Sequence, residues 1–315
     1  MRIVVTGASG FVGRALCARL LSDGHTVVAA VRAAGAAPAG TRPVVVGDLA
    51  APVDWSPALA GADALVHLAA RVHVVRDTAS DPDAAFAAVN VHATGRLFAA
   101  ARAAGVGRAV FASSVKALAE ASGDRPLRDD DAPAPMDAYG RSKRDGEAAV
   151  AASGVPTAIL RPPLVYGAGV TGNLATLARL VRRGVPLPVA GIANRRSLIG
   201  VGNLVGAIAF CLARPETAGR RLLVADVDLS TEAIVRALAA ADGRRPRLLP
   251  APPILFAILR GIGAGALVDR LAGSLQVDSG AIRALGWRPE IAPDREFAAL
   301  MAALDRPAMV GSPPA

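Results

Sequence analysis

The sequence is poor in the residues that build metal centres, disulfide frameworks and base-stacking surfaces. Its 315 residues include two cysteines, four histidines and only 3% aromatic residues. Cys17 and Cys211 lie in apolar, helix-like stretches without Cys-x-x-Cys spacing, which predicts buried thiols in a reducing compartment and no metal site. The net charge of +9 permits an anionic partner. Because the arginines are dispersed and few rings can stack on bases, small acidic molecules are favoured over nucleic acid.

Long apolar runs are also missing. The first apolar run, Arg2 to Val5, is short and leads directly into a glycine-containing turn, so no signal peptide is predicted. The most hydrophobic late stretch, Pro252 to Gly273, is interrupted by Arg260, Asp269 and several glycines, and falls short of the roughly 20 apolar residues that span a bilayer. We therefore expect a buried or interfacial helix there, no membrane insertion and a cytoplasmic protein.

Lysine and tyrosine are nearly absent, which draws attention to where they occur. The chain has two lysines against 33 arginines, and two tyrosines. Tyr139 and Lys143 are four residues apart on a predicted helix running to about Ser153, so their side chains share one helix face. An ammonium group beside a phenol stabilises the phenolate and lowers the tyrosine pKa, which suits acid–base chemistry. Arginine has a much higher pKa and cannot replace lysine in that role.

The first 32 residues have the pattern of a strand–helix–strand unit. Apolar runs at Arg2 to Val5 and Thr26 to Val31 flank a helical pattern from Phe11 to Leu21. The turn between the first strand and the helix carries a Gly-x-x-Gly-x-x-Gly spacing, where glycines permit a tight turn and close approach of a diphosphate to the helix N-terminus. It predicts a dinucleotide-binding loop formed by Gly7, Ser9, Gly10, Phe11, Val12 and Gly13.

Residues after the next strands bear on the choice of cofactor. An acidic residue that would bind the adenine ribose is missing after the second strand, and Arg32 stands there instead, which favours NADP(H) with NAD(H) possible. Asp48, followed by Leu49, is expected either to accept a hydrogen bond from the adenine amino group or to cap its own turn. The small-residue turn Leu68, Ala69 and Ala70 lets a cofactor lie close. His67 is expected to be a core histidine rather than a catalyst.

Strands and helices alternate through the rest of the first half. Strands are predicted at Pro43 to Val46, Ala64 to Ala70, Arg108 to Ala112 and Val155 to Arg161, and one long helix at Asp81 to Ala104. The polar stretch from Ser122 to Pro135, with its aspartate triplet at 129–131, is expected to be a solvated loop. The fold class is α/β, a Rossmann-type doubly wound parallel sheet with a smaller, mainly helical C-terminal substrate lobe. We expect residues 1–166 plus 196–227 in the dinucleotide-binding domain, 167–195 plus 228–305 in the lobe, and a flexible tail at 306–315.

Several motifs in chain order resemble the extended short-chain dehydrogenase/reductase superfamily, in particular its NAD-dependent epimerase/dehydratase branch. The resemblance covers nearly the whole chain and includes segments similar to bacterial nucleotide-sugar 4-reductases and UDP-glucose 4-epimerase-like proteins of polysaccharide synthesis. The motifs are the glycine loop, Asp48-Leu49, His67-Leu68-Ala69-Ala70, Asn90, Ser113-Ser114, Tyr139-x-x-x-Lys143, Arg161-Pro162-Pro163-Leu164-Val165-Tyr166-Gly167, Gly172-Asn173 and Asn194-Arg195-Arg196.

The resemblance implies roles for individual residues. Tyr139 is expected to be the acid/base at the sugar C4 oxygen, Lys143 to bind the nicotinamide ribose, and Ser114 to hydrogen-bond the reacting oxygen. Ser113 is less suited, because Ser114 lies 25 residues before Tyr139, in the family's usual register. Further cofactor contacts are expected from Asn90 and Pro162, and diphosphate contacts from Asn173 and Arg196. Lys116 is expected either to reach a substrate phosphate or to be solvated, and His73 either to line the pocket or to be an ordinary loop residue.

The resemblance also limits the reaction. Many relatives have asparagine where Leu164 stands, so one polar substrate contact is missing or supplied elsewhere. Val115-Lys116 replaces the last two residues of the Thr-Asp-Glu type triad of dehydratases, which disfavours dehydration. We expect reduction of a UDP-4-keto-6-deoxy-N-acetylhexosamine in surface-polysaccharide synthesis, with a UDP-glucose/UDP-N-acetylglucosamine 4-epimerase holding NAD tightly as the alternative. A non-catalytic dinucleotide sensor is a third reading, and a homodimer is expected from the family.

Overall fold

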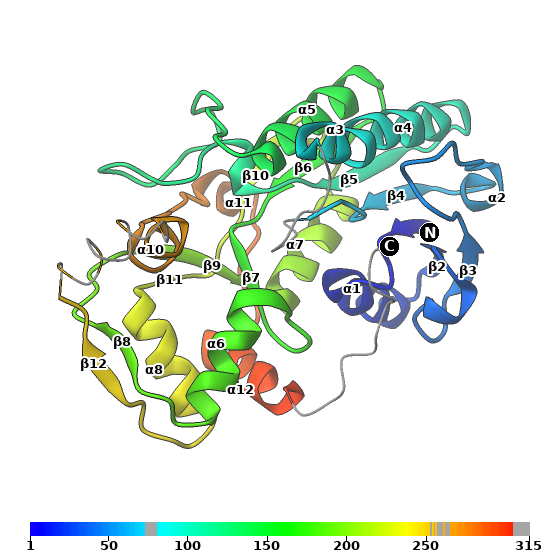
Figure 1. Cartoon of the computed structure of the whole chain (residues 1–315). Coiled ribbons are helices and arrows are strands. Elements are labelled where there is room, and N and C mark those ends of the chain that lie inside the picture. The colour runs from blue at the N-terminus through cyan, green and yellow to red at the C-terminus, as the bar shows by residue number, and fades with distance from the viewer. Residues whose placement is uncertain (73–80, 253, 255, 257–260, 262–264, 305–315) are drawn as a thin grey trace.

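The computed structural model describes residues 1–72, 81–252, 254, 256, 261 and 265–304, and its centre is a parallel β-sheet (Figure 1). The sheet has seven strands in the order β3-β2-β1-β4-β5-β6-β10, and every pairing is parallel. This arrangement confirms the predicted doubly wound α/β fold. In chain order the strands are β1 (Arg2–Thr6), β2 (Thr26–Val31), β3 (Arg42–Val45), β4 (Ala64–His67), β5 (Arg108–Ala112), β6 (Thr157–Arg161) and β10 (Arg221–Leu223).

The strand order reverses between β1 and β4, which run side by side in the middle of the sheet. Their register pairs Thr6 with His67, so the turns that follow both strands meet at the same edge. Ligands of such sheets bind at the carboxyl ends of the strands, where the order reverses. The glycine loop after β1 and the small-residue turn after β4 therefore face each other at the expected binding edge.

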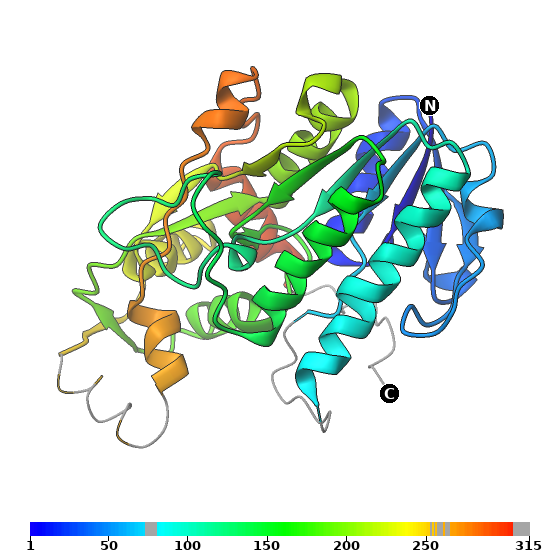
Figure 2. The ribbon, with the colours of Figure 1, turned by 90° about the horizontal axis from the view of Figure 1, so that it is seen from above.

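Helices cover both faces of the sheet. Cluster residues of α1 (Phe11–Ser22) and α7 (Val201–Ala213) pack with sheet residues such as Ile3, Val5 and Val27 in one apolar core. A second core on the opposite face joins α2 (Ser56–Leu59), α4 (Thr94–Ala103) and α5 (Ala138–Ala152) to Val4, Val28 and Leu65. Figure 2 shows α4 and α5 lying side by side across this face. Because successive residues of β1 point to opposite faces, one apolar strand supplies both cores.

Two smaller sheets and several helices form the rest of the molecule. One sheet has the order β11-β9-β7, with β7 (Leu164–Tyr166) parallel to β9 (Arg196–Gly200) and β11 (Val227–Leu229) antiparallel to it. The other pairs β8 (Leu187–Ala190) with β12 (Leu248–Pro250). A third core, centred on buried Tyr166 stacked on Phe297 at 4.5 Å, joins them to α6 (Gly172–Arg182), α8 (Thr231–Ala241) and α12 (Pro293–Ala303). The same part of the chain also contains α10 (Gly265–Ala272) and α11 (Gly280–Ala284).

The predicted long helix from Asp81 to Ala104 is interrupted. It consists of α3 (Pro82–Ala87), a six-residue π-helical segment (Ala88–Ala93) and α4. At this segment the Asn90 carbonyl presses against α5, because a Cβ at Gly146 would lie only 2.5 Å from the Asn90 oxygen. Hydrophobic periodicity does not distinguish a single π turn from α-helix, so the prediction was wrong on this point.

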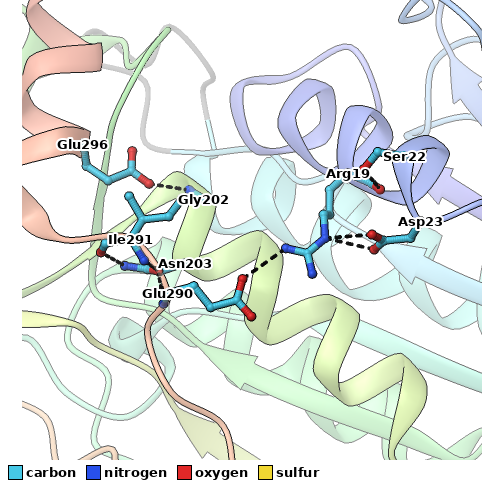
Figure 3. A network of polar contacts seen from close by, with 8 residues as sticks. All are labelled: Arg19, Ser22, Asp23, Gly202, Asn203, Glu290, Ile291 and Glu296. Atoms are coloured by element: carbon cyan, nitrogen blue, oxygen red, sulfur yellow. Dashed lines mark hydrogen bonds and ion pairs between the residues drawn. The ribbon is translucent and has the colours of Figure 1, made fainter.

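A polar network fixes the first helix, α1, to the C-terminal part of the chain (Figure 3). Arg19 of α1 binds Asp23 one turn on and reaches Glu290 at 3.5 Å. Asn203 of α7 uses its whole amide group: its oxygen accepts the N–H groups of residues 290 and 291, and its nitrogen donates to the Ile291 carbonyl and to Asp226. Glu296 accepts the Gly202 N–H at 2.8 Å. The last helices are thereby held against the first.

Within the described part of the chain no helix is long and apolar enough to cross a membrane. Cys17 and Cys211 are buried as free thiols, as predicted, and burial raises the pKa of each to about 12. The predicted tail and His73 lie outside the described residues, as does most of the stretch from Pro253 to Ala264.

Candidate active site

The glycine loop after β1 is shaped by close backbone contacts. Gly7 has a φ of +67°, and a Cβ there would lie 2.7 Å from the Ala69 nitrogen. At Gly13, in the first turn of α1, a Cβ would lie 2.1 Å from the Gly7 oxygen. Side chains at either position would force the loop away from the β4 turn or from its own helix. The spacing thus has the physical basis that the sequence predicted.

The N-terminus of α1 is free to bind an anion. Gly10 is its exposed N-cap, no side chain of the described residues caps it, and its first turn has no acidic residue. The first N–H groups of a helix lack intrahelical partners and carry a partial positive charge, which suits a diphosphate. Ser9, Phe11 and Val12 are half-buried at the same rim. These residues fit the pyrophosphate of a dinucleotide.

The two residues predicted to contact the adenosine end are both exposed. Arg32 follows β2 and makes no hydrogen bond or ion pair with any residue of the described ranges, so its guanidinium is available. Asp48 accepts the Ala50 N–H through Oδ1 at 2.9 Å, which is the turn-capping role considered above. Its second carboxylate oxygen accepts no hydrogen bond from the described residues, so an adenine contact is compatible with the cap.

The β4 turn lies against the glycine loop through a buried hydrogen-bond chain. Thr6 Oγ1 contacts His67 Nδ1 at 2.6 Å, and His67 Nε2 contacts Thr94 Oγ1 at 2.9 Å. The imidazole stacks on Phe111, and burial, with a smaller contribution from the Lys143 charge, lowers its pKa to about 3. His67 is therefore a neutral core histidine, as predicted. Leu68, Ala69 and Ala70 are half-buried directly after it.

Asn90 is buried behind this turn, where it joins three parts of the chain. Its side-chain oxygen accepts the Arg71 N–H at 2.8 Å, and its nitrogen donates to the Arg71 carbonyl and to Ser142 Oγ, each at 2.9 Å. The amide thus holds the backbone just past the β4 turn against α5. In this structure Asn90 shapes the wall of the predicted cofactor site. Pro162, also predicted to contact the cofactor, is buried after β6 and accepts the Val115 N–H.

Ser114, Tyr139 and Lys143 gather at the carboxyl end of β5, and we call them the Ser-Tyr-Lys corner. Asp137 begins α5 by accepting the Gly140 N–H at 2.6 Å, a capping bond that the sequence analysis did not identify although an aspartate before a helix is its usual signal. Tyr139 follows in the first turn, half-buried, with its ring edge-on to Phe86 at 6.0 Å. Lys143 lies one turn later and is 2% exposed.

The pKa of Tyr139 lies above the ordinary value for tyrosine, which corrects the expectation that Lys143 lowers it. Burial raises the Tyr139 pKa to about 12, a hydrogen bond with Ser114 lowers it, and the nearby Asp137 carboxylate raises it. Lys143 instead donates to the Ala112 carbonyl at 2.6 Å and lies over the Phe111 ring. Burial lowers the Lys143 pKa to about 8, opposed by the Glu147 charge. The phenol is a proton donor at neutral pH.

Ser113 belongs to a different set of contacts, which we call the buried arginine–glutamate network. Its hydroxyl donates to Glu147 at 2.6 Å, and Glu147 also accepts two hydrogen bonds from Arg161 and one from Arg221. The Arg161 and Glu147 side chains are each 2% exposed. Sequence reasoning missed this network, although Glu147 follows Lys143 by one helical turn and Arg161 ends an apolar strand.

The residues predicted to bind the substrate differ in their surroundings. Asn173 is exposed at the start of α6, whose N-terminus has no side-chain cap among the described residues. Arg196 is half-buried at the start of β9, donates to the Gly273 carbonyl at 3.0 Å, and has its pKa lowered by burial. Lys116 is neither free nor merely solvated, because its ammonium binds Asp137 at 2.6 Å and Glu120 at 3.0 Å. Leu164 is 41% exposed.

The aspartate triplet is less solvated than predicted. Asp129 is half-buried and accepts the Leu223 N–H of β10, and burial raises its pKa to about 6. Asp131 pairs with Arg125 at 2.6 Å, which holds its pKa at about 2. The bond to Leu223 holds the loop to the sheet. The loop backbone is also hydrogen-bonded to the segment after α10. No group of three or more potential metal ligands occurs among the described residues.

Comparisons with known proteins identify the family and the fold. A family model described as "NAD dependent epimerase/dehydratase family" matches residues 3–225. A "UDP-glucose 4-epimerase" of Vibrio cholerae is 39% identical over 297 residues, covering 91% of this chain and 90% of that protein. The solved structure "MoeE5 in complex with UDP-glucose and NAD" has a TM-score of 0.75 at 26% identity, with 96% and 98% coverage. A UDP-glucuronic acid 4-epimerase from Bacillus cereus in complex with NAD, at 19% identity and a TM-score of 0.77 over 98% and 100% of the chains, has the same fold.

Proposed function

This chain belongs to the NAD-dependent epimerase/dehydratase family, and on that premise we propose that it transfers hydride between C4 of a UDP-sugar and a nicotinamide cofactor. The observation that carries the proposal is the Ser-Tyr-Lys corner, assembled beside an open glycine loop at the carboxyl edge of the sheet. The chain contains only two lysines and two tyrosines, and one of each stands at this corner.

The residues of the corner have complementary tasks. Tyr139 keeps its proton at neutral pH and can donate it to the C4 oxygen when hydride is added at C4. In the opposite direction Tyr139 has to accept that proton, which requires a lower pKa than the chain alone provides. Additional positive charge near the phenol would lower that pKa, and it has to come with the bound cofactor, because Lys143 does not lower the Tyr139 pKa in this structure. Ser114 is within hydrogen-bonding reach of Tyr139 and holds the same substrate oxygen.

The proposed cofactor site uses features already described. The α1 N-terminus would hold the diphosphate, and Asp48 and Arg32 would lie at the adenosine end. Lys143 would contact the nicotinamide ribose. The nicotinamide supplies or accepts the hydride, and its positive charge in the oxidised form further favours the Tyr139 phenolate.

The nucleotide-sugar diphosphate would be bound from the lobe. Arg196 presents a partly desolvated guanidinium, for which an anion is a favourable partner. The N-terminus of α6, an eleven-residue helix without a side-chain cap among the described residues, offers Asn173 and its first N–H groups as further partners for an anion. Leu164 supplies an apolar surface where many relatives have a polar side chain.

Of the two reactions considered from the sequence, 4-epimerisation with tightly held NAD has the stronger support. The Vibrio cholerae relative, named as a UDP-glucose 4-epimerase, matches nine-tenths of both chains. MoeE5, bound to UDP-glucose and NAD, supports the same substrate class. Reduction of a UDP-4-keto sugar with NADPH is the second candidate, and exposed Arg32 favours it because a guanidinium suits the 2′-phosphate.

One assay separates these candidates. The purified protein is incubated with UDP-glucose or UDP-N-acetylglucosamine without reductant, and separately with a UDP-4-keto-6-deoxy-N-acetylhexosamine and either NADPH or NADH. C4 epimers formed without net loss of cofactor establish the epimerase, whereas loss of reduced cofactor matched to product establishes the reductase. Turnover of none of these nucleotide sugars refutes the proposal.

The cofactor preference is tested at Arg32. We expect Arg32→Asp to weaken NADPH binding by about tenfold and to spare NADH, because an aspartate repels the 2′-phosphate and accepts the ribose hydroxyls. Arg42→Asp, which changes an exposed arginine at the start of the edge strand β3, is the control for net charge. Equal ratios of NADPH to NADH affinity before and after the Arg32 change would contradict the assignment.

A further inference from the structure

Lys116 stands two residues after Ser114, in the turn that connects β5 to the rest of the chain. Its backbone N–H donates to Ser114 Oγ at 3.1 Å, so the two residues are held in one short 3₁₀ turn (Val115–Ala117). The side chain extends to the start of α5, where the ammonium binds Asp137 at 2.6 Å. Lys116 therefore touches both segments that supply the hydroxyl groups of the Ser-Tyr-Lys corner.

Asp137 divides its carboxylate between two tasks. Oδ2 accepts the Lys116 ammonium, while Oδ1 caps α5 by accepting the Gly140 N–H at 2.6 Å. Glu120 completes the cluster, because one of its oxygens binds the Lys116 ammonium at 3.0 Å and the other accepts the Asp137 N–H at 3.3 Å. Burial alone would lower the Lys116 pKa, but the hydrogen bonds that the ammonium donates to Asp137 and Glu120, together with their charges, outweigh it and raise the pKa.

The backbone at this junction leaves little space for movement. A Cβ at Gly140 would lie 2.5 Å from the Lys116 carbonyl oxygen, so the first turn of α5 packs directly on the β5 turn. Tyr139 is the residue before Gly140. The turn that carries Tyr139 therefore lies in direct backbone contact with the turn that carries Ser114.

We propose that Lys116 is a positioning residue, which through Asp137 and Glu120 fixes the first turn of α5 against the Ser114 turn and so sets the approach of Tyr139 to Ser114. The effect of Lys116 on the rate of turnover rests on the proposed function. It differs from the two roles expected from the sequence, because the ammonium is already bound by two carboxylates. A displacement of a reacting group by about 1 Å can lower the rate on the order of 100-fold.

The first test compares Lys116→Met with Lys116→Arg in the full-length protein. Lys116→Met should lower kcat about 10- to 100-fold and leave KM for the UDP-sugar within about threefold, because substrate affinity does not depend on this contact. Lys116→Arg keeps a cation for Asp137 and should recover most of the lost kcat. Arg144→Met, which removes an exposed ion pair on α5, is the matched control. A raised KM with unchanged kcat would show that Lys116 binds substrate, and would overturn the proposal.

A second readout does not depend on turnover. With 3-fluorotyrosine incorporated, the chain gives two ¹⁹F resonances, because it has only two tyrosines, and Tyr139→Phe assigns them. Lys116→Met should shift or broaden the Tyr139 resonance and leave that of Tyr166, buried in the third core, in place. Should Lys116→Met fail to fold, Asp137→Asn, which retains an N-cap acceptor but loses the charge, takes its place. An unchanged Tyr139 resonance refutes the proposed role of Lys116, whether or not a UDP-sugar is turned over. A lack of turnover by the wild-type protein refutes only the proposed function.

Discussion

Ser113 and Ser114 are adjacent in the sequence, yet their side chains belong to regions with different properties. Ser113 donates to Glu147 in the buried arginine–glutamate network, where Arg161 and Glu147 are almost completely excluded from water. Ser114 faces Tyr139 in the Ser-Tyr-Lys corner, where Ser114 and Lys143 are buried and Tyr139 is half-buried. Both regions are built on the same helix, α5, and on the ends of neighbouring strands.

The difference between the two regions lies in how far their polar groups are already used. In the network, each Glu147 oxygen accepts two hydrogen bonds from Ser113, Arg161 or Arg221, so the carboxylate is held in one orientation. In the corner, Tyr139 and Lys143 have strongly shifted pKa values because burial is not fully compensated. The network fixes the helix, and the corner retains groups that can react. Five substitutions test this division of labour.

The largest effect is expected at Tyr139. Tyr139→Phe removes the proton donor and should lower kcat by about 10²- to 10⁴-fold, the range for loss of general acid–base catalysis. The melting temperature should be nearly unchanged, because the substitution keeps the ring and removes only the hydrogen bond with Ser114. Steady-state kinetics and thermal unfolding of the same preparation check both parts. Undiminished turnover would remove Tyr139 from the mechanism.

A large loss of stability, rather than of chemistry, is expected at Glu147. Glu147→Gln leaves the Arg161 cation buried without its counter-charge and should lower the free energy of unfolding by about 3–5 kcal/mol. Urea denaturation followed by circular dichroism measures it. Glu216→Gln breaks an exposed pair with Arg214 and should cost about 1 kcal/mol or less. Equal losses for the two variants would mean that the network does not stabilise the fold as described.

The neighbouring serines offer the sharpest contrast. Ser114→Ala should reduce kcat about tenfold or more with little effect on stability, because it removes one hydrogen bond to the reacting oxygen. Ser113→Ala should lower the free energy of unfolding by about 1–3 kcal/mol, since a hydrogen bond to a buried carboxylate is lost, and should preserve most of kcat. Measuring kcat and urea midpoints for both variants decides the question. The reverse pattern would exchange the roles of the two residues.

The smallest effect concerns the stability cost of Lys143. Its folded pKa of about 8 lies below the ordinary value of 10.5, so below pH 8 both folded and unfolded chains are protonated and the folded chain carries the cost of a buried charge. Between pH 8 and 10.5 the folded chain loses the proton first, and stability from this group rises with pH. The stability difference between Lys143→Met and wild type should therefore fall by about 1–3 kcal/mol from pH 7 to pH 10.

Urea denaturation at several pH values measures that difference, with Arg144→Met as the control for general alkaline effects. A difference between Lys143→Met and wild type that stays constant with pH would show that the Lys143 charge has no cost in the folded chain.

The elements that position the site were predictable where local patterns determine them. Gly7 and Gly13 are required by close contacts within one strand–helix unit, so their spacing alone indicated the loop. The buried state of His67 followed from its apolar neighbours. By contrast, the π-helical turn at Asn90 lies against a distant segment, through Gly146, and the pairing of Asp137 with Lys116 joins residues far apart in the sequence.

The pKa of Tyr139 could not be derived from spacing either. Four-residue separation places Tyr139 and Lys143 on one face of α5, but their electrostatic coupling depends on where each head group points. The Lys143 ammonium is directed to the Ala112 carbonyl, and burial of the phenol dominates its pKa. Likewise, no sequence periodicity distinguishes a lysine that binds substrate from one that binds carboxylates of its own chain. Lys116 binds Glu120, four residues on, and Asp137, which comes near only in the folded chain.

The most direct test of the proposed chemistry follows the hydride itself. In a single turnover, the wild-type enzyme is mixed with a UDP-4-keto sugar and a reduced nicotinamide cofactor carrying deuterium at the transferred position, and the product is examined by NMR and mass spectrometry. We predict deuterium at C4 of the sugar, whether the natural reaction is reduction or epimerisation, and little or no labelled product with Tyr139→Phe. Product labelled at another carbon, or no transfer of deuterium by the wild-type enzyme, would contradict the proposed role of the Ser-Tyr-Lys corner.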